Sequence, residues 1–156
     1  MRTTISITRV LALASFTIAL SAGTARAQKL APAQLPAPVQ AAFSKAFPKA
    51  MDVEWKMKGT QYKVEFETGL LFRDHEIWYD ADGKELRHEE EISASDLPGA
   101  VAKAIAADFP GYRTDDVERI TVEGAASYVV ELKQAGQPEW KVAYDATGKQ
   151  LQKAMD

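Results

Sequence analysis

The sequence predicts an α+β fold of two tandem repeats, in which each repeat has one helix followed by about four antiparallel strands and the helices pack on one face of the sheet. Similar segments recur at offsets of 62 to 66 residues, and within each copy a helical spacing of apolar residues gives way to an alternating one. We expect residues 1–27 to be a signal peptide, 28–34 a flexible lead-in, 35–92 the first repeat and 93–156 the second.

The N-terminal segment has the layout of a secretory signal peptide. Arg2 and Arg9 precede an apolar run over residues 10–20, and the small-residue triplet Ala25-Arg26-Ala27 follows it. The run is much shorter than the ~20 apolar residues that a membrane-spanning helix needs. We therefore expect cleavage after Ala27 and release of a free protein into the periplasm or the medium, without a stable membrane anchor.

The composition excludes several classes of protein. The chain has 156 residues and no cysteine, so a disulfide framework, a thiolate metal site, a cysteine nucleophile and a lipid-modified N-terminal cysteine are all excluded. After cleavage at the predicted site, 16 basic and 22 acidic residues remain, which gives a net charge of −6. This charge argues against a nucleic acid or an anionic membrane surface as the partner.

A helix is predicted at the start of each copy. In the first copy one apolar stripe has helical spacing, formed by Val39, Ala42, Phe43, Ala46 and Phe47. The second copy repeats the stripe with Val101, Ala104, Ile105 and Phe109. Pro36 and Pro98 suit a first helical turn, whereas Pro48 and Pro110 end each helix because the residue before a proline is disfavoured in the α conformation.

Strands are predicted after each helix. Apolar residues alternate with charged ones around Val53, Trp55 and Met57 and again around Tyr62, Val64 and Phe66, which is the period of a sheet buried on one face. Hairpin turns are marked by glycines after polar residues, at Gly59, Gly83, Gly124 and Gly148. The string around Gly83, Tyr-Asp-Ala-Asp-Gly-Lys-Glu-Leu, recurs around Gly148 as Tyr-Asp-Ala-Thr-Gly-Lys-Gln-Leu.

The sheet face away from the helices is the predicted binding surface. If the apolar strand residues point inward, the outward positions form a charged set with one tryptophan: Lys56, Lys63, Glu65, Glu76, Trp78, Glu131 and Lys141, with Lys133 beside them. Tryptophan is enriched among residues that anchor a partner, so we predict these as partner-binding residues. The alternative is that Trp78 packs on a neighbouring loop or a long lysine side chain.

The repeated motifs resemble those of the PepSY-like family, whose domains are similar to β-lactamase-inhibitor proteins. The motifs are Leu-Pro-x-x-Val at the helix start, Phe-Pro at its end, Tyr-x-Val-Glu-Phe or Leu in a middle strand, and Tyr-Asp-Ala-x-Gly-Lys-x-Leu in the last hairpin. The resemblance covers residues 35–151 and implies an exported, non-catalytic module without a cofactor. It also implies that the open sheet face and its loops bind a protein, as in the related inhibitors. No individual contact residue is carried over from the family.

Two metal sites are conceivable from the residue types. Asp80, Asp82 and Glu89 match part of a calcium-binding loop, but the flanks are extended and the second copy keeps only the turn residues, so a hairpin turn is favoured. His75 and His88 lie near several glutamates. Because His75 aligns with Trp140 of the second copy, we interpret it as a packing residue and His88 as a solvated one, and we predict no metal site.

The leading functional prediction is a binding module for a protein or peptide of the cell envelope, with inhibition of an enzyme as one form of that activity. The alternative is a protein that binds a small ligand or senses a divalent cation through the acidic hairpin. A hydrolase ranks last, because no Gly-x-Ser-x-Gly motif occurs and Ser93, Ser95 and Ser127 lie in predicted linker or turn segments. The sequence leaves the oligomeric state open, since edge strands can pair between chains.

Overall fold

The computed structural model describes residues 29–156, so the predicted signal peptide lies outside the described residues. Within them the chain forms two helices, α1 (Ala37–Ala46) and α2 (Gly99–Asp108). The first half contributes β1 (Lys29–Leu30), β2 (Met51–Lys58), β3 (Gln61–Thr68), β4 (Arg73–Tyr79) and β5 (Glu85–Glu91). The second half contributes β6 (Arg113–Val122), β7 (Ala125–Lys133), β8 (Trp140–Asp145) and β9 (Gln150–Met155).

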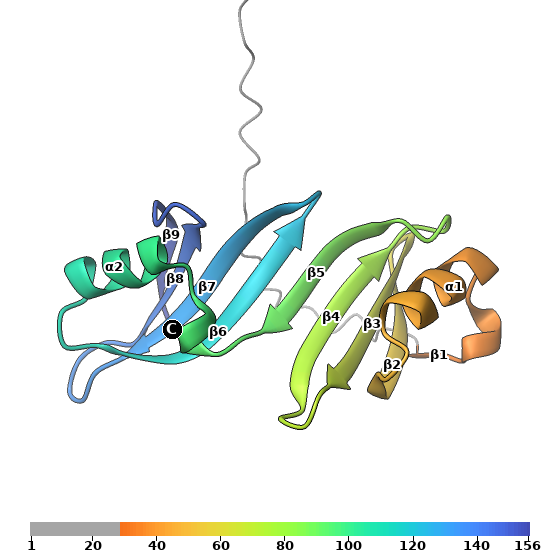
Figure 1. Ribbon diagram of the computed structural model, residues 1–156, viewed down its shortest axis with the longest axis horizontal. Helices are drawn as coiled ribbons and strands as arrows, with labels where there is room; N and C mark the ends of the chain where they lie inside the picture. The colour runs from red at the N-terminus through yellow and green to blue at the C-terminus, as the bar shows by residue number, and fades with distance from the viewer. Residues whose placement is uncertain (1–28) are drawn as a thin grey trace, which may run out of the picture.

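All nine strands form one antiparallel sheet in chain order, so the predicted α+β class with two repeats is confirmed. The pairing of β5 with β6, from Arg87 opposite Val122 to Glu91 opposite Glu118, joins the two halves in a single sheet. β1 pairs with the edge of β2 and is followed by a short 3-10 turn, Pro32–Gln34, within the segment expected as a lead-in. Figure 1 shows the two helices at opposite ends of the sheet, with β5 and β6 between them.

Both helices cover the same face of the sheet, which the strand register establishes. Ile77 of β4 lies opposite His88 of β5, and His88 lies opposite Thr121 of β6. Thr121 and Val117 are four residues apart on one strand and point to the same side. Since Ile77 is buried under α1 and Val117 under α2, no helix of residues 29–156 lies over the other face of the sheet.

Each helix covers its own apolar core. Under α1 the buried residues are Leu35, Val39, Phe43, Trp55, Val64, Phe66, Ile77 and Tyr79. Under α2 they are Ile92, Val101, Ile105, Phe109, Val117, Tyr128, Val130, Leu132, Val142 and Tyr144. The helix residues of these cores belong to the predicted apolar stripes, except that Ala46, expected in the first stripe, is exposed at the last position of α1. Each helix ends where the sequence predicts, at a phenylalanine directly before a proline.

The β4–β5 and β8–β9 turns hold the start of each helix against the sheet. Asp80 Oδ1 accepts hydrogen bonds from the backbone N–H groups of Asp82 and Lys84, and Asp145 makes the equivalent pair of contacts in the second half. Gly83, with φ +81°, lies directly against the carbonyl of Pro38 at the start of α1. The recurring Asp-x-x-Gly string therefore serves as a turn that docks on the helix.

Val53 departs from the expected alternation. It was expected to face the core, but its exposed fraction is 41%. The register of β2 against β3 shifts between Met51 and Glu54, and Asp52 has φ +51°. A bulge of this kind changes which side the following residue faces, so regular alternation begins only at Glu54.

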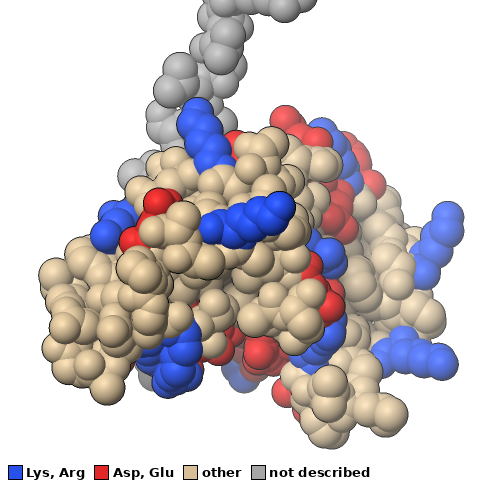
Figure 2. Space-filling view, turned by 60° about the vertical axis from the view of Figure 1, so that its left-hand side comes forward, with Lys and Arg blue, Asp and Glu red and all other residues tan. Residues whose placement is uncertain are grey.

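None of the helices in the described residues is long and apolar enough to cross a membrane. Figure 2 turns the α2 end of the molecule toward the viewer, and most of the surface on this side is uncharged. Acidic side chains there form separate patches beside lysines and arginines. Exposed alanines of α2 contribute to the uncharged area.

Candidate functional site

The open face of the first half carries a row of basic residues beside Trp78. Lys56 of β2 lies opposite Lys63 of β3, Lys63 lies opposite Trp78 of β4, and Trp78 lies opposite Arg87 of β5. The row runs across four neighbouring strands because opposite residues of antiparallel strands share a face. The structure thus brings together the predicted residues Lys56, Lys63 and Trp78.

A parallel row of glutamates lies next to it, formed by Glu54, Glu65, Glu76 and Glu89. The two rows are joined by ion pairs: Lys56 to Glu54 at 2.9 Å and to Glu65 at 2.6 Å, Lys63 to Glu65 at 2.8 Å and to Glu76 at 2.6 Å, and Arg87 to Glu89. Lys63 is buried; burial opposes its charge, but the two glutamates outweigh this and raise its pKa. Glu65 and Glu76 are therefore held in place with the lysines.

Trp78 is half-buried between two cations. Lys63 Nζ lies 5.0 Å from the ring centroid and Arg87 Cζ lies 5.5 Å from it. This geometry allows cation–π attraction on the open face. It places Trp78 against long basic side chains, as the packing alternative expected, and the residue keeps part of its surface exposed. Its role as a partner contact stays a prediction.

A second row of carboxylates borders an acidic groove. Glu67 lies opposite Asp74, and Glu91 lies opposite Glu118. The groove has a volume of about 410 Å³, and the residues that line it are Asp52, Glu54, Glu65, Phe66, Glu67, Asp74, His75, Glu76, Glu89, Glu90, Glu91, Asp116 and Glu118. Within the described chain, ion pairs reach the first glutamate row but not Glu67, Asp74 or Glu91. The groove is therefore a concentrated region of negative charge.

Glu118 shows the electrostatic cost of this groove. Burial raises its pKa, and the neighbouring carboxylates of Glu89, Asp116 and Glu76 raise it further, against the opposing effect of Lys141. Carboxylates that are crowded together without matching cations destabilise the folded state. The groove is consequently a place where added positive charge from outside the chain would be favourable.

The predicted residues of the second half form a separate group on the same face. Glu131 of β7 lies opposite Lys141 of β8, with Lys141 Nζ 3.1 Å from the carboxylate, and Lys133 contacts Asp115 at 2.6 Å. Burial opposes the charge of Lys141, but its hydrogen bond to Glu131 and the negative charges of Glu118, Glu131 and Asp156 together outweigh this and raise the pKa. A small apolar cluster, formed by Ile120, Val129 and Ala143, is the nearest buried part of the same face.

The hairpin tip between β3 and β4 is a feature that the sequence analysis missed. Leu70, Leu71 and Phe72 are consecutive and have exposed fractions of 95%, 81% and 61%. The tip follows Glu67 and precedes Asp74, so it lies at the end of the acidic groove. Three adjacent exposed apolar residues are uncommon on a protein surface unless they bind something. The available signal was the Gly-Leu-Leu-Phe string, which neither a helical nor an alternating period explains.

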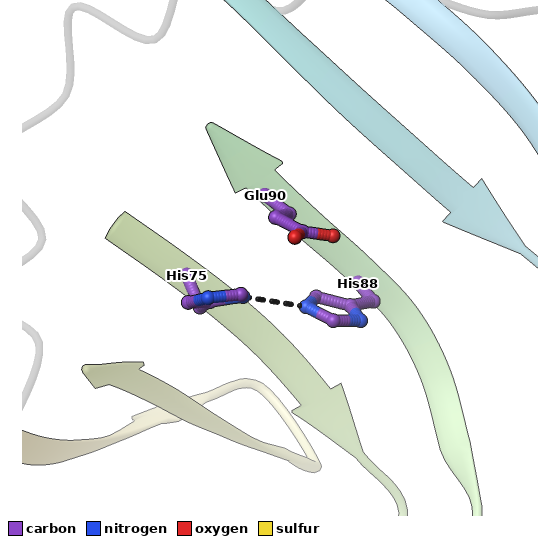
Figure 3. A group of neighbouring side chains, drawn as sticks. All are labelled: His75, His88 and Glu90. Carbon is purple, nitrogen blue, oxygen red and sulfur yellow. Dashed lines mark hydrogen bonds between the residues drawn. The ribbon is translucent and has the colours of Figure 1, made fainter. Parts of the chain in front are cut away.

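The two histidines lie together on the helix-covered face. His75 of β4 is buried, as expected from its strand position, but His88 of β5 is half-buried rather than solvated. His75 Nδ1 lies 3.0 Å from His88 Nε2 (Figure 3). His75 Nε2 lies 2.7 Å from Thr68 Oγ1. Burial lowers the pKa of His75, and burial together with the neighbouring His75 lowers the pKa of His88 to about 4.

The residues of the conceivable calcium site do not converge. Asp80 Oδ1 is engaged by backbone N–H groups of its own turn, whereas Glu89 lies on the open face and pairs with Arg87. Asp80 therefore makes the contacts of an ordinary hairpin turn, whereas Glu89 belongs to the ion pairs of the open face. Cation binding at this turn stays an untested alternative.

Known proteins share both the sequence pattern and the fold. The profile of a family described as "putative beta-lactamase-inhibitor-like, PepSY-like" matches residues 23–84 and again residues 60–152. The structure is similar to that of a BLIP-like protein from Bacteroides fragilis NCTC 9343, with 25% identity, 76% of this chain and 84% of that chain covered, and a TM-score of 0.60. No curated protein sequence matches the chain significantly.

Two further solved structures share the fold. A DUF2874 family protein from Bacteroides uniformis ATCC 8492 is 24% identical, with 77% of this chain and 88% of that chain covered and a TM-score of 0.64. A protein from Bacteroides eggerthii DSM 20697, described as "putative periplasmic", is 20% identical, with 78% of this chain and 88% of that chain covered and a TM-score of 0.66. At these identities the similarity shows the fold alone.

Proposed function

The chain belongs to the PepSY-like family, which is described as beta-lactamase-inhibitor-like, and from this premise we propose that it is an exported, non-catalytic module that binds a protein or peptide of the cell envelope. The family supports a binding module rather than an enzyme. The similarity to a BLIP-like protein supports a protein partner, and where that partner is an enzyme, binding at this surface would inhibit it.

The observation that carries the proposal is the exposed apolar tip beside an acidic groove. Leu70, Leu71 and Phe72 offer apolar area that a partner can bury, at about 25 cal/mol per Å². Next to them, Glu67 and Asp74 offer negative charge with no lysine in contact among the described residues. This combination fits a partner that presents an apolar pocket with lysines or arginines around it.

The basic row and the second-half group complete the proposed surface. Lys56, Lys63, Glu65, Glu76 and Trp78 form an ordered, ion-paired platform beside the groove, and Glu131 and Lys141 extend the same face. Side chains that are already fixed by mutual ion pairs lose little conformational freedom when a partner binds. Trp78 contributes the large aromatic area typical of a binding anchor.

Export is the second part of the proposal. Residues 1–27 have the layout of a signal peptide, and a protein of the same fold is described as periplasmic. We expect the protein recovered from its native host to begin at Gln28, which a mass spectrum of the intact chain would show. A spectrum that retained residues 1–27 would contradict export by a cleaved signal.

Capture from a periplasmic extract tests the binding surface. The mature chain is immobilised, and the bound protein is compared between the wild type and a tip variant with Leu70→Ser, Leu71→Ser and Phe72→Ser. The control is Leu151→Ser, which removes an exposed apolar residue of β9 away from the tip. Trp78→Ala is measured alongside, with its melting temperature.

We expect the tip variant to lose the captured protein with an unchanged melting temperature, because the tip residues are largely exposed in the folded chain. The Leu151→Ser control should retain it. Loss of capture by Trp78→Ala without a change in melting would assign that ring to the interface, whereas a lowered melting temperature would assign it to packing. Equal capture by wild type and tip variant would contradict the proposed surface.

A further inference from the structure

A cluster of three possible metal ligands lies on the helix-covered face, and two of its members, His75 and Glu90, also line the acidic groove. His75 is on β4, and His88 and Glu90 are on β5. One ligand atom from each of the three lies within 4.8 Å of the other two. Figure 3 shows the two imidazole rings pointing toward one another, with the Glu90 carboxylate beside them.

The strand register explains why the three side chains meet. Glu90 lies directly opposite His75, and His88 lies two residues before Glu90 on the same face. Direct and diagonal neighbours across two strands are close enough for long side chains to touch. Two ring nitrogens bound to one tetrahedral Zn²⁺ at about 2.0–2.1 Å lie roughly 3.3 Å apart. The observed 3.0 Å between His75 Nδ1 and His88 Nε2 is within a few tenths of an ångström of that spacing.

Two of the candidate ligands, His75 and Glu90, also have an outer partner of the kind that metal ligands have. Thr68 Oγ1 is 2.7 Å from His75 Nε2, which leaves Nδ1 of that ring for an ion. The carboxylate of Glu85 is 3.9 Å from His88 Nδ1, which is too long for a hydrogen bond. Glu90 forms an ion pair through Oε2 with Arg119, which leaves Oε1 available to an ion. Such partners fix the orientation of ligating imidazoles and carboxylates.

The second repeat shows that the fold does not require these residues. In the second repeat, Trp140 and Met155 face each other at the positions that His75 and Glu90 occupy in the first. Lys153, opposite Val142, occupies the position of His88, which lies opposite Ile77. There the position is filled by packing, with Lys153 Nζ 3.8 Å from the centroid of Trp140. The first half therefore has two histidines and a glutamate at the positions where the second half has Trp140, Lys153 and Met155.

We propose that His75, His88 and Glu90 form a binding site for a divalent transition-metal ion of the Zn²⁺ type, with water or a partner's group as the fourth ligand. Two imidazoles and a carboxylate are a ligand set that Zn²⁺ binds in proteins. The side chains of His88 and Glu90 retain exposed fractions of 18% and 15%, which gives an ion access.

The site would connect the two halves of the sheet. An ion held by His75 and His88 joins β4 to β5, and Glu90 connects this pair through Arg119 to β6, the first strand of the second half. Metal binding would consequently stabilise the region in which the two repeats meet. This effect does not depend on a protein partner at the open face.

Titration of the tag-free mature chain with ZnCl₂ at pH 7, followed by calorimetry, tests the proposal. We expect one ion per chain and a rise in melting temperature on saturation. Thr68→Val, which removes an outer partner, should reduce the affinity for zinc about 10–100-fold. His88→Gln, which removes a ligand, should reduce it by more than that. The control is Glu91→Gln, which removes the neighbouring carboxylate on the opposite face of β5 and should leave the affinity unchanged.

A second pair of measurements keeps the test independent of folding defects. The double variant His75→Trp with His88→Lys transfers the second half's packing pair to the first half, so it should fold and bind no ion. With the wild type, Co²⁺ should give the visible absorption of tetrahedral nitrogen and oxygen ligation. The proposal would be overturned if the chain did not bind zinc stoichiometrically. It would also be overturned if Glu91→Gln lowered the affinity as much as Glu90→Gln does, because the ion would then lie in the acidic groove.

Discussion

The turn glycines that dock on the helices offer a direct test of how each repeat is held together. At Gly83 a methyl group would lie 2.6 Å from the carbonyl oxygen of Pro38, and at Gly148 it would lie 2.5 Å from that of Ala100. Gly124, in the β6–β7 turn, has the same φ of +81° as Gly83, but nothing lies within 4 Å of the added methyl. The pair Gly83→Ala and Gly124→Ala therefore separates backbone strain from steric conflict with the helix.

The expected magnitudes follow from these two contributions. A side chain in the left-handed region costs about 1–2 kcal/mol, and this contribution is common to both variants. Ordinary contact begins near 3.4 Å, so Gly83→Ala must also move the start of α1 or the turn by about 0.8 Å. Forcing one extra methyl group into a packed contact costs about 1–3 kcal/mol. Gly83→Ala should therefore lower the free energy of unfolding by about 1–3 kcal/mol more than Gly124→Ala.

Urea denaturation followed by tryptophan fluorescence measures the difference, since Trp55 lies in the core under α1. Gly148→Ala should behave like Gly83→Ala because the same contact recurs in the second half. If Gly83→Ala and Gly124→Ala were equally stable, the idea that the turn fixes the helix on the sheet would be wrong.

Three further predictions concern charge. Glu118→Gln should raise the free energy of unfolding at pH 7 by about 0.2–1 kcal/mol in urea denaturation, because it removes a carboxylate that lies opposite Glu91 and whose pKa is raised by burial. Lys63→Met should lower it by about 1–3 kcal/mol, because Glu65 and Glu76 lose a charged partner. The pKa of His88 is about 4 when folded against about 6.5 when unfolded, so the unfolded chain binds more protons between these values and stability should fall as pH decreases from 6.5 toward 4. The loss is at most about 3 kcal/mol, reduced by the ring's partial exposure, and His88→Gln should remove this component from a series of melting curves against pH.

Local patterns in the sequence predict most of the fold. The apolar stripe of α1, the proline after it and the glycine turns act over a few residues, and the structure has them where they were predicted. Val53 was misplaced because a bulge depends on how β2 and β3 pair, which alternation within one strand does not reveal.

The candidate sites were less predictable because they depend on contacts between strands. Alternation correctly placed Lys56 and Trp78 on the open face, but the two carboxylate rows arise from the register of five strands. His88 was expected to be solvated because its own strand is strongly charged. In the structure it lies beside the buried His75 of the adjacent strand and contacts the ring of Phe47. Register of this kind is set by turn lengths and bulges together, and a single sequence does not specify it.

The differences between the two repeats indicate where function resides in a duplicated fold. The shared features, the helix stripe, the Phe-Pro end and the docked glycine, all bury apolar groups or form turns, so they are what each copy needs in order to fold. The exposed Leu70–Phe72 tip has no large apolar counterpart in the second repeat, where the turn at residues 134–138 reads Gln-Ala-Gly-Gln-Pro. His75 and His88 likewise have a packing pair in their place. Because one copy shows that stability requires neither feature, the fold alone does not explain their presence in the other.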